Sequence, residues 1–329
     1  MRCGGNRAIF FLFALVAGLF GDLRGPAAVP KWPGRHDLFM ELSPLSSADI
    51  AISPVYAIGS IYLAALFIGV IMDIVLFFRV LSQPWSWENM ARRIRAGPWR
   101  PGDAAWIFVL LILIQLSAGL IHWGGIKLGW FAADAKDTAA ALVQGLLFHG
   151  IALLIVCWFI RRRNISWNEA FGMGWRNLKP AAGRGLAGYL GIIPIVFFTS
   201  FLCQLFLYAA GYPVTLQDVV AVFMEPQSGW SLFFLLLLAV VVAPVVEETL
   251  FRGILLPVLM KKTGPGAAVV ISSALFALVH QHLPSFAPLF VLAVVLSMLY
   301  ISSGSLWTPI VLHSVFNGVS ICILLLAMT

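Results

Sequence analysis

Residues 230–260 read WSLFFLLLLAVVVAPVVEETLFRGILLPVLM, and this stretch decides the class of fold. It is longer than the roughly 20 apolar residues that cross a bilayer as a helix. In lipid an isolated segment satisfies its backbone hydrogen bonds only as a helix, so we expect a helical span over 230–260. Pro244 and Pro257 lie within the span and predict a tilt or a kink.

The composition of the whole chain supports a membrane protein. Of its 329 residues, 61% are hydrophobic and 11% are charged, whereas about a quarter of the residues of a soluble domain are charged. This excludes a soluble enzyme, and a disordered chain would need the opposite composition. We therefore predict an all-α fold, a polytopic transmembrane bundle of about eight spanning helices at residues 55–78, 104–122, 139–160, 185–209, 230–260, 266–283, 286–302 and 306–327.

The N-terminal region and the cysteines add little chemistry. Residues 1–52 are predicted to be a leader followed by an irregular segment. The short apolar stretch 8–20 behind Arg2 and Arg7 fits either a signal peptide or a retained anchor. The cysteines are scattered, and they give neither a disulfide framework nor zinc-finger spacing: Cys3, Cys157, Cys203 and Cys322.

The distribution of charge predicts the topology. If the spans alternate in direction, fifteen of the 21 Lys and Arg residues lie on one side: Arg2, Arg7, Arg79, Arg92, Arg93, Arg95, Arg100, Arg161, Arg162, Arg163, Arg176, Lys179, Arg184, Lys261 and Lys262. By the positive-inside rule these basic loops are cytoplasmic, and we expect a multi-pass protein of the cell membrane, a bacterial inner membrane. The net charge of +7 is then a topology signal that anionic membrane lipids can complement, and no nucleic acid partner is expected.

The candidate chemistry begins inside the span 230–260 with Glu247, Glu248 and Arg252. Ionisable residues at membrane depth cost several kcal/mol unless they are paired, so they are functional candidates. Glu248 and Arg252 are four residues apart in the favourable order for a helical ion pair. Glu247 is rotated by about 100°, has no local partner and could act as a general base. A packing cluster of charges or an ion pathway is the alternative.

Two later spans carry the other candidates. His280 lies in 266–283, and His313 and Asn317 share one face of 306–327 because they are four residues apart. At about 1.5 Å per residue, these groups and Glu247 can all meet near the middle of the membrane, in one polar intramembrane chamber. Each histidine alone could be a packing residue, and Asn317 could be interhelical glue. Other polar side chains in the spans are interpreted as interhelical hydrogen-bond partners: Gln115, Gln144, Gln204 and His149.

Three motifs in this order resemble the CPBP family of intramembrane proteases, which includes the Rce1-type CAAX prenyl endopeptidases and the bacterial Abi proteins. They are Glu-Glu-x-x-x-Arg at 247–252, Phe-x-x-x-His at 276–280 and His-x-x-x-Asn at 313–317. The resemblance covers 230–327, and the segment 167–175 is more loosely similar. It implies that residues 166–329 form a transmembrane catalytic domain (motifs within 243–317), preceded by transmembrane helices in 53–165 that lie outside the resemblance.

The resemblance also implies an activity and roles for the residues. The chain would be an endopeptidase that hydrolyses a peptide bond with an activated water. Glu247 matches the catalytic glutamate, His280 its partner at the water, and His313 with Asn317 the pair that stabilises the oxyanion, while Glu248 and Arg252 match supporting positions. The substrate is then a peptide or protein, such as a membrane protein or a lipidated tail.

Other readings of the same residues stay open. We expect no cofactor, because the motifs lack a His-Glu-x-x-His helix. The alternative is a zinc metalloprotease with Glu247, His280 and His313 as ligands. A non-proteolytic scaffold or a regulatory or immunity protein of the same fold is a further possibility, as is a transporter or proton pathway.

Overall fold

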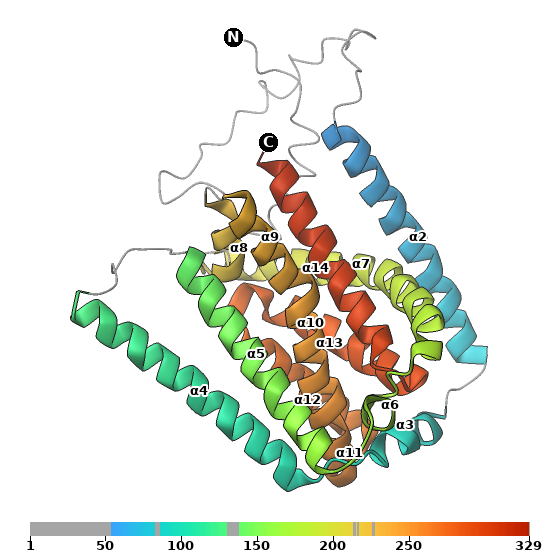
Figure 1. The fold of residues 1–329 in the computed structure, drawn as a ribbon. Coiled ribbons are helices and arrows are strands. Elements are labelled where there is room, and N and C mark those ends of the chain that lie inside the picture. Colours follow the sequence, from blue (N-terminus) through green and yellow to red (C-terminus); the bar gives the residue numbers. More distant parts are fainter. Residues whose placement is uncertain are drawn as a thin grey trace, which may run out of the picture.

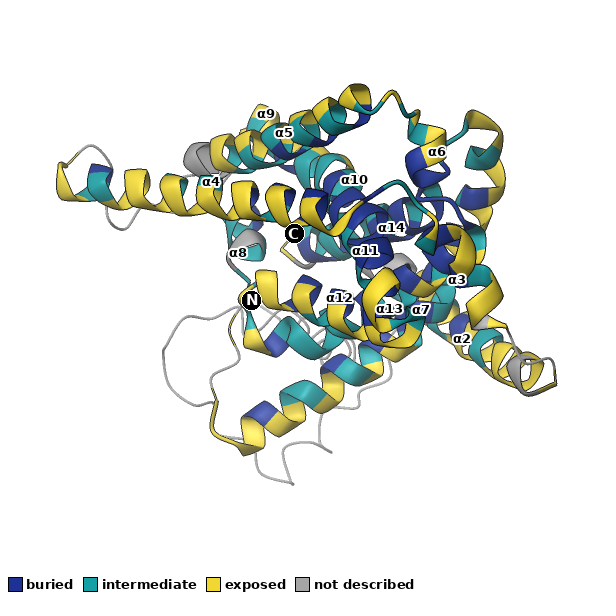
Figure 2. Cartoon of the chain, turned by 90° about the horizontal axis from the view of Figure 1, so that it is seen from below, coloured by how far each residue is buried: buried dark blue, intermediate teal, exposed yellow. Residues whose placement is uncertain are grey.

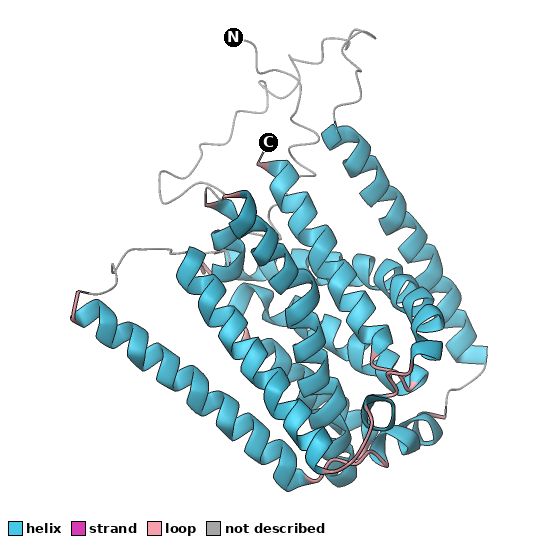
Figure 3. Cartoon of the chain, in the orientation of Figure 1, coloured by secondary structure: helices cyan, strands magenta, loops and turns pink. Residues whose placement is uncertain are grey.

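The computed structural model describes residues 54–82, 86–129, 138–212, 215, 217–225 and 228–328. Over these ranges the chain consists of helices and loops, without a β-strand (Figure 3). The predicted all-α fold, a polytopic transmembrane bundle, is confirmed. The predicted leader, residues 1–52, lies outside the described residues.

Helices make up nearly all of the described chain (Figure 1). In chain order they are α2 (Pro54–Ser82), α3 (Trp87–Arg95), α4 (Pro101–Lys127), α5 (Thr138–Arg162), α6 (Trp167–Phe171), the 3-10 turn η1 (Trp175–Asn177), α7 (Leu178–Ala209), α8 (Asp218–Met224), α9 (Gly229–Leu237), the π-helical η2 (Leu238–Val242), α10 (Ala243–Glu248), the π-helical η3 (Thr249–Leu255), α11 (Leu256–Thr263), α12 (Pro265–Val279), α13 (Leu283–Ser303) and α14 (Trp307–Ala327).

Among the described residues, seven helical segments are long and apolar enough to cross a bilayer. They are Gly59–Arg79, Pro101–Lys127, Leu142–Arg162, Trp167–Ala209, Gly229–Thr263, Leu283–Ser303 and Trp307–Leu326. The predicted segment 266–283 corresponds to α12, which has only 15 residues. At about 1.5 Å per residue, α12 is shorter than a hydrocarbon core of about 30 Å. Of the eight predicted spans, seven are therefore long enough to cross the bilayer in the described part of the chain, and the eighth, α12, is too short.

The short helix ends because the chain turns directly after it. The amides of His280 and Gln281 bond to carbonyls three residues back, which tightens the last turn. Gln281 adopts a left-handed conformation with φ of 51°, and Pro284 occupies the first turn of α13, where its missing N–H costs nothing. α12 and α13 then pack along each other. His280 is thereby placed at a helix end rather than in mid-helix.

The helices differ in what they face. α7, α13 and α14 pack on one another in the middle of the bundle, and α2 packs against α7. α4 lies at the edge of the bundle, and most of its surface is exposed (Figure 2). Large apolar side chains remain uncovered on both outer helices, for example Phe67 on α2 and Trp106 and Leu120 on α4. Such faces fit contact with lipid.

The basic loops that sequence analysis assigns to one side lie at one end of the bundle. Lys261, at the end of α11, donates hydrogen bonds of 2.8 Å to the carbonyls of Gly97 and Trp99. Arg163, after α5, donates to the Pro98 carbonyl at 3.1 Å and forms an ion pair with Asp103 of α4. The loops after α3, α5 and α11 therefore meet (Figure 1, lower end).

The segment before α7 is fastened to the start of α14 at the same end. Leu306 N–H donates to the Phe171 carbonyl at 3.0 Å, and Ser305 Oγ donates to the Gly172 carbonyl at 2.9 Å. Gly172 has φ of 67°, and a Cβ there would lie 2.0 Å from the carbonyl oxygen of Gly304. A glycine is required because the two backbones touch at this point.

Candidate active site

The fifth span departs from regular α-helix on both sides of its acidic pair. η2 and η3 are π-helical, and α10 between them carries Glu247 and Glu248. In η2 the amide of Ala243 bonds to the carbonyl of Leu238, five residues back. Such π insertions are rare, and they occur frequently at functional sites. They turn the two carboxylates relative to the rest of the span.

The ion pair predicted between Glu248 and Arg252 is present and fully buried. Arg252 Nη1 donates to Glu248 Oε1 at 2.9 Å, and both side chains have 0% exposure. Arg252 Nη2 also donates to the Ala293 carbonyl at 3.2 Å, and the guanidinium lies 4.4 Å from the ring centre of Phe276. These contacts compensate the charge of Glu248 inside the bundle and fix α10 against α12 and α13.

Glu247 points the other way and meets histidines. Its Oε1 lies 3.9 Å from His149 Nε2, and its Oε2 lies 3.8 Å from His313 Nε2. The side chain is 23% exposed. The expectation that Glu247 has no partner on its own helix holds, but two partners come from α5 and α14. The carboxylate is therefore flanked by imidazoles on both oxygens.

His313 connects the two carboxylates. Its Nδ1 donates to Glu248 Oε1 at 2.9 Å, and its ring is 5% exposed. The same ring presents Nε2 to Glu247. Because Glu248 is itself held by Arg252, the orientation of the His313 ring depends on the buried ion pair.

His280 has its tautomer fixed by the backbone. Its Nδ1 lies 2.7 Å from the carbonyl of Phe276, and a carbonyl only accepts, so Nδ1 carries the proton. The ring stacks at an angle on Phe276, 4.8 Å between centres. In the neutral ring Nε2 is therefore left as an acceptor.

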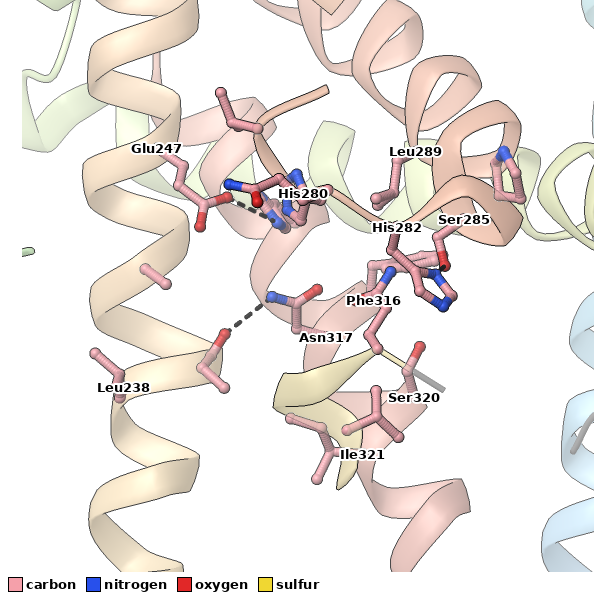
Figure 4. A pocket seen from close by; sticks show the side chains of 18 of the residues that line it. Leu238, Glu247, His280, His282, Ser285, Leu289, Phe316, Asn317, Ser320 and Ile321 are labelled. Carbon is pink, nitrogen blue, oxygen red and sulfur yellow. Dashed lines mark hydrogen bonds and ion pairs between the residues drawn. The ribbon is translucent and has the colours of Figure 1, made fainter. Parts of the chain in front are cut away.

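Asn317 approaches the fifth span from α14. Its Nδ2 donates to the Ala239 carbonyl of η2 at 2.9 Å (Figure 4). One amide hydrogen is used in this contact, and the second is left for another acceptor.

The four side chains predicted to be catalytic border one cavity of about 920 Å³, and His149 lines it too. Glu247 and His280 lie close together on it, with Asn317 farther along the same wall (Figure 4). The cavity is also lined by apolar and aromatic residues from the other spans, including Tyr62 of α2, Phe108 of α4, Phe148 of α5 and Tyr189 of α7. The structure thus brings the four residues predicted to be catalytic from three helices to one chamber, with supporting Glu248 and Arg252 behind it.

His149 is the residue at this site that the sequence analysis did not select. It was interpreted as an interhelical hydrogen-bond partner, and the structure places it against Glu247. A histidine within an apolar span was the available signal. Its spacing from Glu247 along the chain carries no information, because the two residues are on helices that meet only in the folded bundle.

The zinc alternative would take Glu247, His280 and His313 as ligands. Within the described part of the chain, no three His, Cys, Asp or Glu side chains are grouped as metal ligands. A catalytic zinc site uses three protein ligands at about 2.0–2.3 Å from the ion. Nδ1 of His313 is committed to Glu248, so His313 has only Nε2, 3.8 Å from Glu247 Oε2, to offer to an ion.

Comparison with known proteins shows what parts of this chain resemble. A family model described as type II CAAX prenyl endopeptidase Rce1-like matches residues 229–319. An Escherichia coli protein described as "Uncharacterized 24.3 kDa protein" is 26% identical in an alignment of 218 residues that covers 63% of this chain and 92% of that protein. A Bacillus subtilis (strain 168) protein described as "Putative membrane peptidase YdiL" is 30% identical over 83 residues, 25% of this chain and 34% of that protein. No solved structure matches.

Proposed function

We propose that the protein is an intramembrane endopeptidase that uses a water activated by Glu247 and His280, and the premise is the match of residues 229–319 to the family model described as Rce1-like. The observation that supports the proposal is the convergence of Glu247, His280, His313 and Asn317 on one cavity. These residues come from α10, the end of α12 and α14, and all lie within the matched segment. Their chemistry is a base for water and donors for a developing oxyanion.

In the proposed mechanism, Glu247 and His280 activate the water. A water between them donates one hydrogen bond to the Glu247 carboxylate and one to Nε2 of His280, which is an acceptor because Nδ1–H is bound to Phe276. Glu247 takes the proton as the water oxygen attacks the carbonyl carbon of the peptide bond. The proton then passes to the amide nitrogen, and the C–N bond breaks to give an amine and a carboxylic acid.

In the proposed mechanism, two side chains of α14, Asn317 and His313, stabilise the oxyanion. Asn317 has one amide hydrogen beyond the one given to Ala239, and it donates this hydrogen to the oxyanion. His313 gives Nδ1–H to Glu248, so it donates from Nε2 only as an imidazolium. Both residues rise from the same face of one helix, which keeps their donors aligned.

The proposed substrate is a peptide or protein segment that reaches the cavity within the membrane. The walls from α2, α4, α5 and α7 are largely apolar, so an apolar residue or a lipidated tail fits beside the scissile bond. The basic end of the bundle faces the cytoplasm in this proposal, as the positive-inside rule requires. The cell membrane is the proposed location.

The experiment compares the wild type with Glu247→Gln. Protein termini are profiled in membranes from cells that express each form, and a quenched peptide is built on the cleavage site found only with the wild type. Purified wild type in detergent should cleave this peptide, and Glu247→Gln should lose most of the rate. Glu88→Gln is the matched control, because Glu88 is an exposed residue of α3 that pairs with Arg95.

Chelation separates the glutamate mechanism from the zinc alternative. We propose that no metal takes part, so exhaustive dialysis against EDTA and 1,10-phenanthroline should leave turnover unchanged. Chelator-sensitive activity that returns with added zinc would overturn the metal-free mechanism while keeping the peptidase. Identical terminal profiles for the wild type and Glu247→Gln would favour the non-proteolytic scaffold instead.

A further inference from the structure

His149 of α5 lies outside the Rce1-like segment and yet contacts its central carboxylate. α5 packs against α9, η2 and α10, and His149 lines the same cavity as Glu247 and His280. Its side chain is 15% exposed, and Nε2 is 3.9 Å from Glu247 Oε1. A helix from the N-terminal half of the chain therefore completes the surroundings of Glu247.

The backbone fixes which nitrogen of His149 faces Glu247. Nδ1 lies 2.7 Å from the carbonyl of Gly145, one turn earlier on α5. Since a carbonyl only accepts, Nδ1 is the donor, and Nε2 is directed at the carboxylate. His280 is held in the same way by the carbonyl of Phe276. Both rings are thus locked by their own helices with Nε2 toward the cavity.

α5 is brought close to the fifth span by a glycine. A Cβ at Gly145 would lie 2.6 Å from Cδ2 of Leu238 in η2. The same residue supplies the carbonyl that orients His149. Gly145 therefore both allows the close approach of α5 to η2 and fixes the orientation of the His149 ring.

Glu247 differs from Glu248 in the side chains that compensate its charge. Glu248 has its compensating charge in Arg252 at 2.9 Å, whereas the contacts of the Glu247 carboxylate within 4 Å, among the described residues, are with imidazoles. His313 faces Oε2 and His149 faces Oε1. Contacts of 3.8 to 3.9 Å are longer than hydrogen bonds, and such contacts often shorten when substrate enters a site.

We propose that His149 is a positioning residue: as an imidazolium it gives Nδ1–H to Gly145 and directs Nε2–H at Oε1 of Glu247 from the α5 side, and this contact aims the carboxylate at the water. The proposal rests on the proposed function of Glu247 as the base. When His149 and His313 hold the two oxygens, the carboxylate cannot rotate away from His280. A general base displaced by about 1 Å can lose up to about 100-fold in rate, so the α5 contact is expected to affect the chemical step and not substrate binding.

The test uses two substitutions with different chemistry. His149→Phe keeps the ring shape and removes both nitrogens, and His149→Gln keeps a polar amide that can reach Glu247. On the quenched peptide, His149→Phe should lower kcat by 10-fold or more, with KM within 2-fold and an unchanged thermal midpoint. His149→Gln should recover part of kcat. His122→Phe on α4 is the matched control, because His122 is exposed and is not among the residues that line the cavity.

A second readout does not depend on turnover. The infrared difference between the wild type and Glu247→Gln isolates the carboxylate band of Glu247. His149→Phe should shift this band, and His122→Phe should not. The two results together separate a contact with the carboxylate from simple packing.

The outcomes are distinguishable from failure of the peptidase proposal. If Glu247→Gln cleaves like the wild type, the proposed function fails. If Glu247→Gln is inactive but His149→Phe keeps kcat within 2-fold and leaves the carboxylate band in place, His149 is a packing residue and the positioning proposal is overturned. It is also overturned if His149→Gln loses as much kcat as His149→Phe while both remain as stable as the wild type.

Discussion

Asn317 on α14 donates a hydrogen bond of 2.9 Å to the backbone carbonyl of Ala239 in the fifth span. The reason lies in the π register of η2, in which Ala243 N–H reaches the carbonyl five residues back. In that register the carbonyl of Ala239 would accept a hydrogen bond from the N–H of residue 244. Residue 244 is proline and has no N–H. Asn317 supplies the missing donor, so it stabilises the irregular helix next to Glu247 in addition to its proposed role at the oxyanion.

Asn317→Ala should therefore lower both stability and activity. It leaves a partly buried carbonyl without a donor, which costs about 1–2 kcal/mol, and it removes an oxyanion donor, which costs about 100-fold to 1,000-fold in kcat. Adding Pro244→Ala restores an N–H in reach of the Ala239 carbonyl. The double variant should regain thermal stability and stay slow. Recovery of both properties would mean that Asn317 acts only through the helix.

Arg252→Leu should strand the Glu248 carboxylate in the core. Breaking a buried pair by removing one partner costs about 3–5 kcal/mol, and Glu248 also holds His313. We expect low abundance in membranes and a large drop in the thermal midpoint in detergent. Arg95→Leu, which breaks the more exposed pair with Glu88, should cost at most about 1 kcal/mol. Equal stability of the two variants would contradict the burial of the Glu248–Arg252 pair.

Gly172→Ala should loosen the attachment between the segment before α7 and the start of α14. The added Cβ would lie 2.0 Å from the Gly304 carbonyl at a residue with positive φ, so both sterics and backbone conformation oppose it. We expect a loss of more than about 1 kcal/mol, read as a lower unfolding temperature. Gly183→Ala in α7 is the control, because its Cβ would meet nothing within 4 Å. A larger loss at Gly183 than at Gly172 would contradict the contact.

The orientation of the bundle is tested by cysteine labelling. In a variant whose four native cysteines are replaced by serine, a membrane-impermeant maleimide applied to intact cells should label Gly129→Cys and not Arg162→Cys. The physical reason is the excess of Arg and Lys at the end of the bundle that holds Arg162 and Lys261. Labelling of Arg162→Cys alone from outside would reverse the topology.

Much of the site was predictable because several of its residues lie four positions apart on one helix. The pair Glu248 and Arg252 follows from a separation of four residues on a helix, and the structure contains it. The common face of His313 and Asn317 follows in the same way, and both residues line the cavity. The convergence with His280 was predicted from depth in the membrane. Their catalytic roles stay predictions.

Other features could not be predicted from spacing. The length of α12 was overestimated, because the predicted span 266–283 continued through the polar residues 280–282, where Gln281 and Pro284 turn the chain. The π register of η2 and the donor that Ala239 receives depend on a side chain 78 residues away. The position of His149 depends on how closely α5 packs on η2, which Gly145 permits.

The sequence by itself determined that the chain is a helical membrane protein, because lipid leaves the backbone no other way to satisfy its hydrogen bonds, and it determined the pairs that sit one turn apart. Only the tertiary structure decided which side chains surround Glu247. Contacts between helices depend on the packing of whole faces and on local departures from helical geometry, and neither is set by the spacing of residues along one helix. The place of His149 beside Glu247, 3.9 Å from its carboxylate, is therefore a property of the folded bundle.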